Sequence, residues 1–175
     1  LASIGGGGVS ALSSLMLANS DFFTGAFPAE YGNAGSGVFD IKLRIGNNEK
    51  HEHAFQAGTM GLDISSEGPI FKKGKASYLF NYRYSTFAIL QYVLPDYIPV
   101  LKYQDLCFKL NFPTQKAGVF SLWGLGYMDK QDPVINEDTI SWSNRSDQEY
   151  DMSNLHMGVL GLNHRFIAGK KTYLN

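Results

Sequence analysis

The sequence of 175 residues predicts an all-β fold, built from antiparallel hairpins that follow one another along the chain. From residue 51 onward, short turn segments alternate with long polar or aromatic connections. The short turns are Phe71–Lys75, Thr114–Gly118 and Ala168–Lys171, and the long connections are about Ala88–Lys102 and Gln131–Glu149. This alternation is typical of membrane β-barrels, whose strands are joined by tight turns at one end and by extended loops at the other.

The bulk composition narrows the class of protein. No apolar run approaches the ~18–20 residues of a membrane-spanning helix, so a membrane role would have to be carried by strands. The net charge is −1, which gives no electrostatic reason to expect nucleic-acid binding. Cys107 is the one cysteine, and it excludes a disulfide framework and a cysteine-based zinc site within this chain. Chain length alone also permits one water-soluble globular domain.

The segments between the turns predict six strands and the start of a seventh. His51–Ile70 has about twice the ~9–11 residues that cross a membrane as a tilted strand, so we expect two strands there. A tight turn around Thr59, Met60 and Gly61 would join them. The remaining strands are expected at Ala76–Phe87, Tyr103–Pro113, Val119–Lys130 and Tyr150–Ile167, and the seventh begins near Thr172.

Polar and apolar residues alternate in the best-defined strands, which places them on opposite faces of a sheet. In Ala76–Phe87 the even positions from Tyr78 to Tyr84 are aromatic and the odd positions from Ser77 to Ser85 are polar, with Leu79 as the exception. In Tyr103–Pro113, Asp105, Cys107, Lys109 and Asn111 oppose Leu106, Phe108, Leu110 and Phe112. The same pattern would suit a sheet that covers a water-soluble core. The loop lengths and the charged residues on the polar face favour lipid on the apolar side and a wet lumen.

Two later strands fit this assignment less well. Val119–Met128 and Leu155–Phe166 are apolar on both faces, which is expected of a barrel wall only where another segment packs against its inner side.

Residues 1–48 have a different character, rich in glycine and without long strands. Leu12, Leu15 and Met16 have helical spacing, and Ser10 could cap a short helix there. The run of four glycines before them lacks the residues of a phosphate-binding loop, so we expect a flexible loop. A short strand at Asp21–Thr24, a compact turn at Glu30–Asn33 and a second strand at Val38–Ile45 follow.

The segment Ala29–Ile41, with the pattern A-E-Y-G-N-A-x-S-G-V-F-D-I, resembles the end of the plug domain of TonB-dependent outer-membrane receptors. The residues after it resemble the first barrel strands of that family. The resemblance implies a plug domain at 1–48 and the beginning of the transmembrane barrel at 49–175. We also expect an internal part of a longer protein, because the chain starts at Leu1 and stops as a strand begins.

What the resemblance implies for function is energy-dependent import of a scarce or bulky substrate across a Gram-negative outer membrane. The implied partners are TonB with ExbB and ExbD, reached through segments outside this sequence, and outer-membrane lipid. A surface lipoprotein lid is a further possible partner, and the substrate itself, a small molecule or an oligomer, is not identified. No enzyme activity, cofactor or nucleic-acid partner is expected.

A plug enclosed by a barrel predicts contacts between the two. An unpaired Glu30 carboxylate inside the wall would be costly, so Arg83 or Lys109 is expected to pair with it, unless Glu30 is a solvated turn residue. Tyr31, Gly32 and Asn33 share this turn. Within the wall, Arg83 and Asp105 are expected as diagonal neighbours if the connection is centred near residue 95. Such a pair would fix the register more than the stability, because a pair on a wet wall contributes only ~0–1 kcal/mol.

Other residue types suggest no catalysis. His51 and His53 share a strand face but have no third metal ligand at a matching spacing, so strand-end polar residues are the preferred interpretation. Cys107 has no histidine within a few residues to activate it.

The long connections hold residues suited to ligand contact, because tyrosine and tryptophan are accompanied there by polar groups. The candidates are Tyr92, Tyr97, Trp142, Asn144 and Arg145. The alternatives are loops that only shield the barrel mouth, a structural or adhesive barrel that does not transport, and a water-soluble β-rich binding domain.

Overall fold

The structure, a computed structural model, is made of strands and two short 3-10 helices, and its strands form two antiparallel sheets. It describes residues 12–25, 27–58, 61–72, 74–85, 101–131, 153–167 and 173–174. An all-β fold is therefore confirmed. The described strands do not close on themselves: β3 (Glu52–Ala57) and β9 (Tyr173–Leu174) are the edges of the larger sheet.

The first part of the chain forms a two-stranded sheet with two short 3-10 helices, η1 (Ser14–Met16) before the first strand and η2 (Ala29–Tyr31) between the two strands. Strands β1 (Asp21–Phe23) and β2 (Val38–Asp40) pair with Phe22 opposite Phe39. These two rings stack with their centroids 4.2 Å apart. Both predicted strands exist, but the second ends at Asp40 rather than Ile45, because beyond it the chain makes only an isolated bridge between Leu43 and Leu17.

The helix predicted near Leu12 is shorter than its pattern suggested. In the described part of this segment, from residue 12 to β1, the helix covers only Ser14–Met16. Ser13 rather than Ser10 caps it, since the Ser13 Oγ accepts a hydrogen bond from the Leu15 amide at 3.3 Å. Ser10 lies outside the described residues. A segment this short has its conformation set by tertiary contacts rather than by helical propensity.

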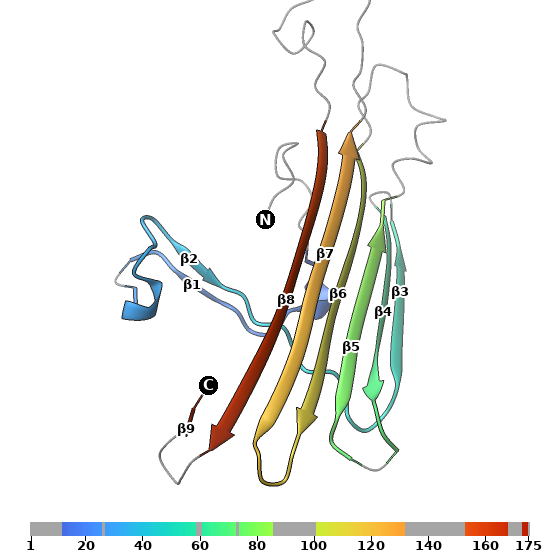
Figure 1. Cartoon of the computed structure of the whole chain (residues 1–175). Helices are drawn as coiled ribbons and strands as arrows, with labels where there is room; N and C mark the ends of the chain where they lie inside the picture. The colour runs from blue at the N-terminus through green and yellow to red at the C-terminus, as the bar shows by residue number, and fades with distance from the viewer. Residues whose placement is uncertain are drawn as a thin grey trace, which may run out of the picture.

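The second sheet has seven strands in sequence order, each antiparallel to the next (Figure 1). Between the edge strands β3 and β9 lie β4 (Leu62–Pro69), β5 (Ser77–Tyr84), β6 (Leu101–Pro113), β7 (Val119–Gln131) and β8 (Ser153–Ile167). The six predicted strands and the start of the seventh are confirmed. The division of 51–70 into two strands is correct as well, with the Gly58 amide donating to the Gly61 carbonyl at 3.0 Å.

Short turns join the strands at one end of this sheet. The turn after β4 is closed by the Ile70 amide donating to the Ala76 carbonyl, and the turn after β6 by the Thr114 amide donating to Gly118. Gly118 has a φ of +83°, which favours glycine, and a Cβ there would also meet the Arg165 carbonyl. The strand ends of β5, β6, β7 and β8 that long connections join lie at the opposite end (Figure 1).

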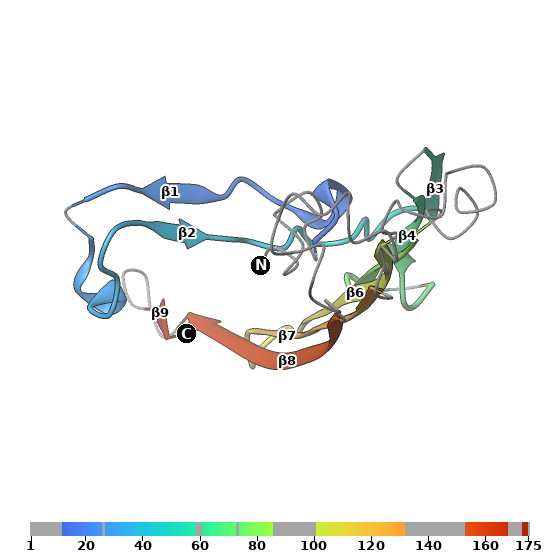
Figure 2. The ribbon, with the colours of Figure 1, turned by 90° about the horizontal axis from the view of Figure 1, so that it is seen from above.

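The register places odd-numbered residues of β4 to β7 on one face, here called the inner face, and even-numbered residues on the other, the outer face. In Figure 2 the sheet curves, and the N-terminal segment lies on the inner side of the curve. The two segments meet in a small apolar cluster of Met16, Leu79, Cys107 and Leu125, with Leu12, Leu43 and Met157 packed against it. Leu79, the exception to the polar pattern of its strand, thus has a partner in Met16.

Candidate functional site: the polar inner wall

The inner face of the sheet carries a row of polar residues that the N-terminal segment contacts. Consecutive strands bring Asp63, Arg83, Asp105 and Tyr127 directly opposite one another, so that the four side chains cross β4 to β7 at one level. Asp105 and Tyr127 are 2% and 3% exposed. Charged and polar groups therefore occupy buried positions of this sheet, beside the apolar Leu79 and Cys107.

The Arg83–Asp105 pair anticipated from the sequence is present, with a different register. The two residues are directly opposed rather than diagonal, and Cys107 faces Asn81 instead of Arg83. The Arg83 Nε lies 3.0 Å from both Asp105 carboxylate oxygens, and its Nη2 lies 2.8 Å from Oδ2. The fork of two nitrogens on one carboxylate fixes the orientation of both side chains.

Asp63 connects the wall to the N-terminal segment. Its Oδ2 accepts a hydrogen bond from the Ser13 hydroxyl at 2.8 Å, and its Oδ1 accepts one from the Asn81 amide at 2.5 Å. Ser13 also caps the N-terminus of η1, so one serine both begins the helix and attaches it to β4. Asp63 was not among the residues predicted from the sequence, although its odd position on β4 could have identified it as an inner-face residue.

Arg44 makes the second connection. Its Nη2 lies 2.7 Å from Glu67 Oε1, its Nη1 donates to Glu67 Oε2 at 2.9 Å, and its Nε donates to the Leu15 carbonyl at 2.5 Å. The Asn47 amide donates to the same Glu67 carboxylate at 2.8 Å. Arg44 thereby ties η1, the chain before β3 and strand β4 together. Arg44 and Glu67 were not predicted from the sequence as contact residues, because no periodicity relates the N-terminal segment to a strand of the sheet.

Two further contacts bring backbone against the wall. The Lys109 ammonium donates to the Leu43 carbonyl at 2.7 Å. Gly46 is buried, and a Cβ at this position would overlap the carbonyl of Tyr78 on β5. Only glycine lets the chain approach the strand so closely. The plug–barrel role expected of Lys109 is thus represented by a contact to a backbone carbonyl and not by an ion pair with Glu30.

Of the two interpretations of Glu30, the structure favours the solvated turn residue. Glu30 is exposed, and among the described residues it pairs with neither Arg83, which is paired with Asp105, nor Lys109, which contacts the Leu43 carbonyl. Tyr31 packs on the ring of Phe23, with centroids 5.8 Å apart, and Gly32 and Asn33 are exposed. The turn projects away from strands β4 to β7 (Figures 1 and 2), so a solvated carboxylate needs no cation there.

The hairpin that carries this turn has its own electrostatics. The Lys42 ammonium lies 2.7 Å from Asp21 and 3.1 Å from Asp40, and these hydrogen bonds, Asp21 first, raise the Lys42 pKa. Partial desolvation raises the pKa of Tyr31, and the Asp40 and Glu30 carboxylates raise it further. These groups hold β1, β2 and η2 together rather than to the wall.

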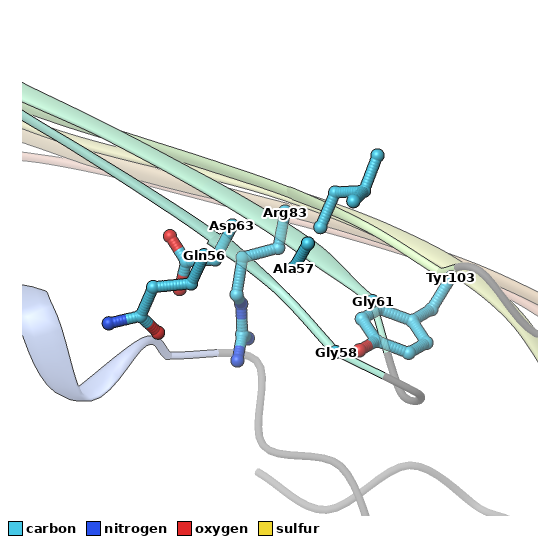
Figure 3. A pocket seen from close by; sticks show the side chains of 8 residues that line it. Gln56, Ala57, Gly58, Gly61, Asp63, Arg83 and Tyr103 are labelled. Atoms are coloured by element: carbon cyan, nitrogen blue, oxygen red, sulfur yellow. The ribbon is translucent and has the colours of Figure 1, made fainter.

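A shallow pocket of about 310 Å³ opens on the inner face beside the Gly58–Gly61 turn. Figure 3 shows Gln56 and Arg83 pointing to the side of the sheet on which the N-terminal segment lies, with Asp63 beside them, and the Tyr103 ring pointing toward the Gly58–Gly61 turn. The pocket lies at the end of the sheet where the long connections begin. It offers amide, guanidinium, carboxylate and phenol groups, a mixture suited to hydrogen bonding a polar ligand.

Close to this pocket lies a second buried carboxylate. Asp129 is 3% exposed, and its neighbour across the strands is Tyr103. Tyr127 lies two residues before it on the same face, and its hydroxyl interacts with the Asp129 carboxylate. A carboxylate buried beside two phenols depends on such interactions, because burial of an unpaired charge is costly.

The outer face has the opposite chemistry. On β6 and β7 its side chains are apolar from Leu106 to Phe112 and from Phe120 to Met128, apart from Gly124 and Gly126. The Phe108 ring lies over Gly124, where a Cβ would approach it to 2.5 Å. Leu160 and Leu162 continue the band on β8 and are 70% and 73% exposed. Large apolar side chains thus remain uncovered over several strands.

The other residues predicted from the sequence add no contact to this site. Tyr92, Tyr97, Trp142, Asn144 and Arg145 lie outside the described residues. His51 Nδ1 lies 3.2 Å from the Tyr78 hydroxyl. Within the described ranges no three histidine, cysteine, aspartate or glutamate residues gather as metal ligands.

Comparison with protein-family models, with curated proteins and with solved structures gives no match for this chain. The described residues include no helix with the length and apolarity to cross a bilayer. The assignment of a function therefore depends on the geometry of the two faces.

Proposed function

We propose that this chain is the end of a plug domain and the first strands of an outer-membrane β-barrel, in a receptor that imports a scarce or bulky substrate by TonB-coupled transport. Residues up to about 48 belong to the plug, and β3 to β9 belong to the barrel wall. The substrate class, the TonB contact and any surface lipoprotein lie beyond the described residues, and the family resemblance alone supports them.

The observation that carries this proposal is the distribution of chemistry between the two faces of the sheet. The inner face buries charged groups against a separate, glycine-rich segment, and the outer face leaves an apolar band uncovered. On β7 that band runs from Phe120 to Met128, roughly 27 Å along the strand at ~3.4 Å per residue. At a tilt of ~40° this length gives a height of ~21 Å, close to the ~25 Å of a barrel band. A water-soluble sheet would bury the apolar face instead.

The contacts between the segment and the wall suit a plug that has to move. The described contacts are mainly polar, and the apolar cluster around Met16 is small. Each of these hydrogen bonds involves a charged group and contributes ~1.5–3 kcal/mol, and the groups can exchange it for hydrogen bonds to water when the segment moves. A pull on the N-terminal side could therefore release the segment while the strands keep their ladder.

A barrel that does not transport is the second candidate, and one observation separates the two. Such a barrel has no need for a docked segment from another unit, whereas here Ser13, Arg44 and Gly46 each make specific contacts with the wall. The docked segment therefore favours the transporter.

The first experiment tests the membrane assignment. Tryptophan is placed at Leu160 on the outer face or at Asn111 on the inner face, with both native tryptophans replaced by phenylalanine. The protein is then reconstituted in bilayers containing brominated lipid. The proposal expects strong quenching for Leu160→Trp and weak quenching for Asn111→Trp. Equal quenching, or a protein that stays monomeric in water without detergent, contradicts it.

The second experiment tests import. A strain without the gene is grown on defined iron, vitamin and carbon sources, with and without TonB. Loss of growth on one source in both strains, restored by the wild-type gene only where TonB is present, supports the proposal. Restoration without TonB supports a passive barrel.

A further inference from the structure

The short-turn end of the seven-stranded sheet carries exposed lysines. Lys72 and Lys75 lie in the turn between β4 and β5, and Lys116 lies in the turn between β6 and β7. Both turns lie at the same end of the sheet (Figure 1). Within the described ranges, none of these three lysines forms an ion pair or a side-chain hydrogen bond. Two turns at one end of the sheet therefore present positive charge to their surroundings.

The carboxylates described near this end interact with other cations. Glu67 on β4 is paired with Arg44, and Glu52 on β3 is paired with Lys50. Glu49 is exposed, and it interacts electrostatically with Lys50. The lysines of the two turns therefore have no carboxylate of the described segments to neutralise them, and an anion from outside the protein can approach them.

Hydrogen bonds fix the conformation of the turn that carries Lys116. The Thr114 hydroxyl donates to the Gly118 carbonyl at 2.7 Å and accepts from the Ala117 amide at 3.0 Å. His164 on β8 reaches the same turn, with its Nε2 2.6 Å from the Ala117 carbonyl oxygen. Lys116 thus lies on a backbone that is held both within the turn and by the neighbouring strand.

At this end of the sheet the apolar band of the outer face ends in a row of aromatic rings. Phe112 on β6 lies directly opposite Phe120 on β7, which lies opposite His164 on β8. The Phe120 and His164 rings stack with their centroids 4.2 Å apart. In membrane barrels, aromatic girdles mark the two levels at which hydrocarbon meets the headgroups. A row in this position places Lys116, in the turn beyond Phe112, on the headgroup side of that boundary.

We propose that the short-turn end of the sheet binds the phosphate groups of anionic phospholipids in the adjacent leaflet, through Lys72, Lys75 and Lys116. The inference rests on the proposed function, because it needs the apolar band to lie in a bilayer. It goes beyond that function in naming the charge of the lipid and the side chains that hold it. Lysine binds phosphate as a point charge, and its long stem lets the ammonium follow a headgroup along the surface. Such contacts would fix the depth of the strands in the membrane, with the ammonium groups level with the phosphates.

The test measures which phospholipid lies beside each turn. Phe120→Trp reports on the turn of Lys116 and Phe71→Trp on the other turn, with the native tryptophans replaced by phenylalanine. The intact protein is reconstituted in mixed bilayers of dioleoyl phosphatidylglycerol and dioleoyl phosphatidylcholine. One lipid or the other is brominated, so the ratio of the two quenching values gives the local lipid preference.

The reporters are expected to show a preference for phosphatidylglycerol that depends on the lysines of their own turn. Lys116→Gln is expected to lower it about fivefold at Phe120→Trp, because a lysine near a lipid surface contributes ~1 kcal/mol. Lys72→Gln with Lys75→Gln is expected to lower it at least as much at Phe71→Trp. High salt is expected to weaken the preference at both positions, because it screens exposed charges.

The controls decide between explanations. Lys42→Gln removes the same charge as Lys116→Gln, but from a lysine already paired with two carboxylates, so it is expected to leave both reporters unchanged. Lys116→Arg is expected to retain the preference, which separates lost charge from damaged folding. No preference before the lysines are changed, a preference that survives the glutamine changes, or an equal loss in Lys42→Gln overturns the site. Quenching of neither reporter, nor of Leu160→Trp, by either lipid overturns the proposed function instead.

Discussion

The two faces of the seven-stranded sheet differ in which side chains they bury, polar ones on the inner face and apolar ones left exposed on the outer face. On the inner face, Asn81 and Asp105 are 0% and 2% exposed, whereas Leu160 and Leu162 on the outer face are more than two-thirds exposed. In a water-soluble protein the hydrophobic effect would favour the reverse, because apolar area removed from water stabilises by ~25 cal/mol per Å². The comparison teaches that the two faces have different surroundings: the inner face is covered by a segment of the same chain, and the apolar outer face is left exposed.

The largest expected effect comes from placing a charge among the exposed apolar side chains of the outer face. Leu160→Arg places a charge in the apolar band and is expected to cost about 2–4 kcal/mol in a bilayer, as for other lipid-facing positions near the midplane. Ile45→Arg, at another exposed apolar residue but in the N-terminal segment, is expected to stay within about 0.5 kcal/mol. Chemical unfolding in lipid bilayers measures both. A neutral Leu160→Arg would mean that water already meets this face.

A smaller effect tests the inner face at its closest backbone contact. Gly46→Ala places a methyl group on the Tyr78 carbonyl and is expected to cost about 1–3 kcal/mol, because a packed backbone cannot shift freely. Gly35→Ala is the matched control, since its Cβ would meet nothing within 4 Å. Proteolysis of the N-terminal segment, with the strands monitored by circular dichroism, reports the change. Equal protease sensitivity in both variants would show that Gly46 is not a docking contact.

The next effect in size concerns the Arg44–Glu67 ion pair, which joins the N-terminal segment to β4. Arg44→Met and Glu67→Gln are each expected to loosen the N-terminal segment by about 1–2 kcal/mol, because charge-assisted hydrogen bonds exceed neutral ones but this arginine remains partly solvated. The double variant is expected to cost less than the sum of the two single changes, which a double-mutant cycle measures. Strict additivity would indicate that the two side chains act independently.

The smallest effect is a pH dependence confined to the β1–β2 hairpin. The Lys42 pKa is raised in the folded state, so the contribution of its pairs with Asp21 and Asp40 is complete below the ordinary value of 10.5. It is lost as the pH rises beyond that value through the folded pKa. Asp21→Asn is expected to lower the Lys42 titration midpoint, followed by NMR of labelled lysine, and Glu30→Gln is the control. An unchanged midpoint in Asp21→Asn would contradict the pairing.

Much of the sheet followed from the sequence because its signals are local. Turn residues predicted where the strands end. The two-residue period predicted which side chains share a face of the sheet, including Leu79 on the face of the polar residues. The register between β5 and β6 was missed by two residues, since nothing local fixes the centre of a long connection. The contacts of Arg44, Glu67 and Ser13 could not be predicted, because each depends on how one unit docks on another. The surroundings of Glu30 could not be predicted for the same reason, because they depend on the direction in which the β1–β2 hairpin points.

Arg44, Gly46 and Asn47 contact the wall just before β3 begins, whereas Ser13 and Met16 contact it some thirty residues earlier. A force applied at the N-terminal side would therefore load these contacts in series rather than in parallel. Ser13 and the Met16 cluster would give way first, and the Arg44 and Gly46 clamp would bear tension last. The segment would detach from the sheet beginning at its N-terminal end. The end next to β3 would stay attached and would guide the segment back.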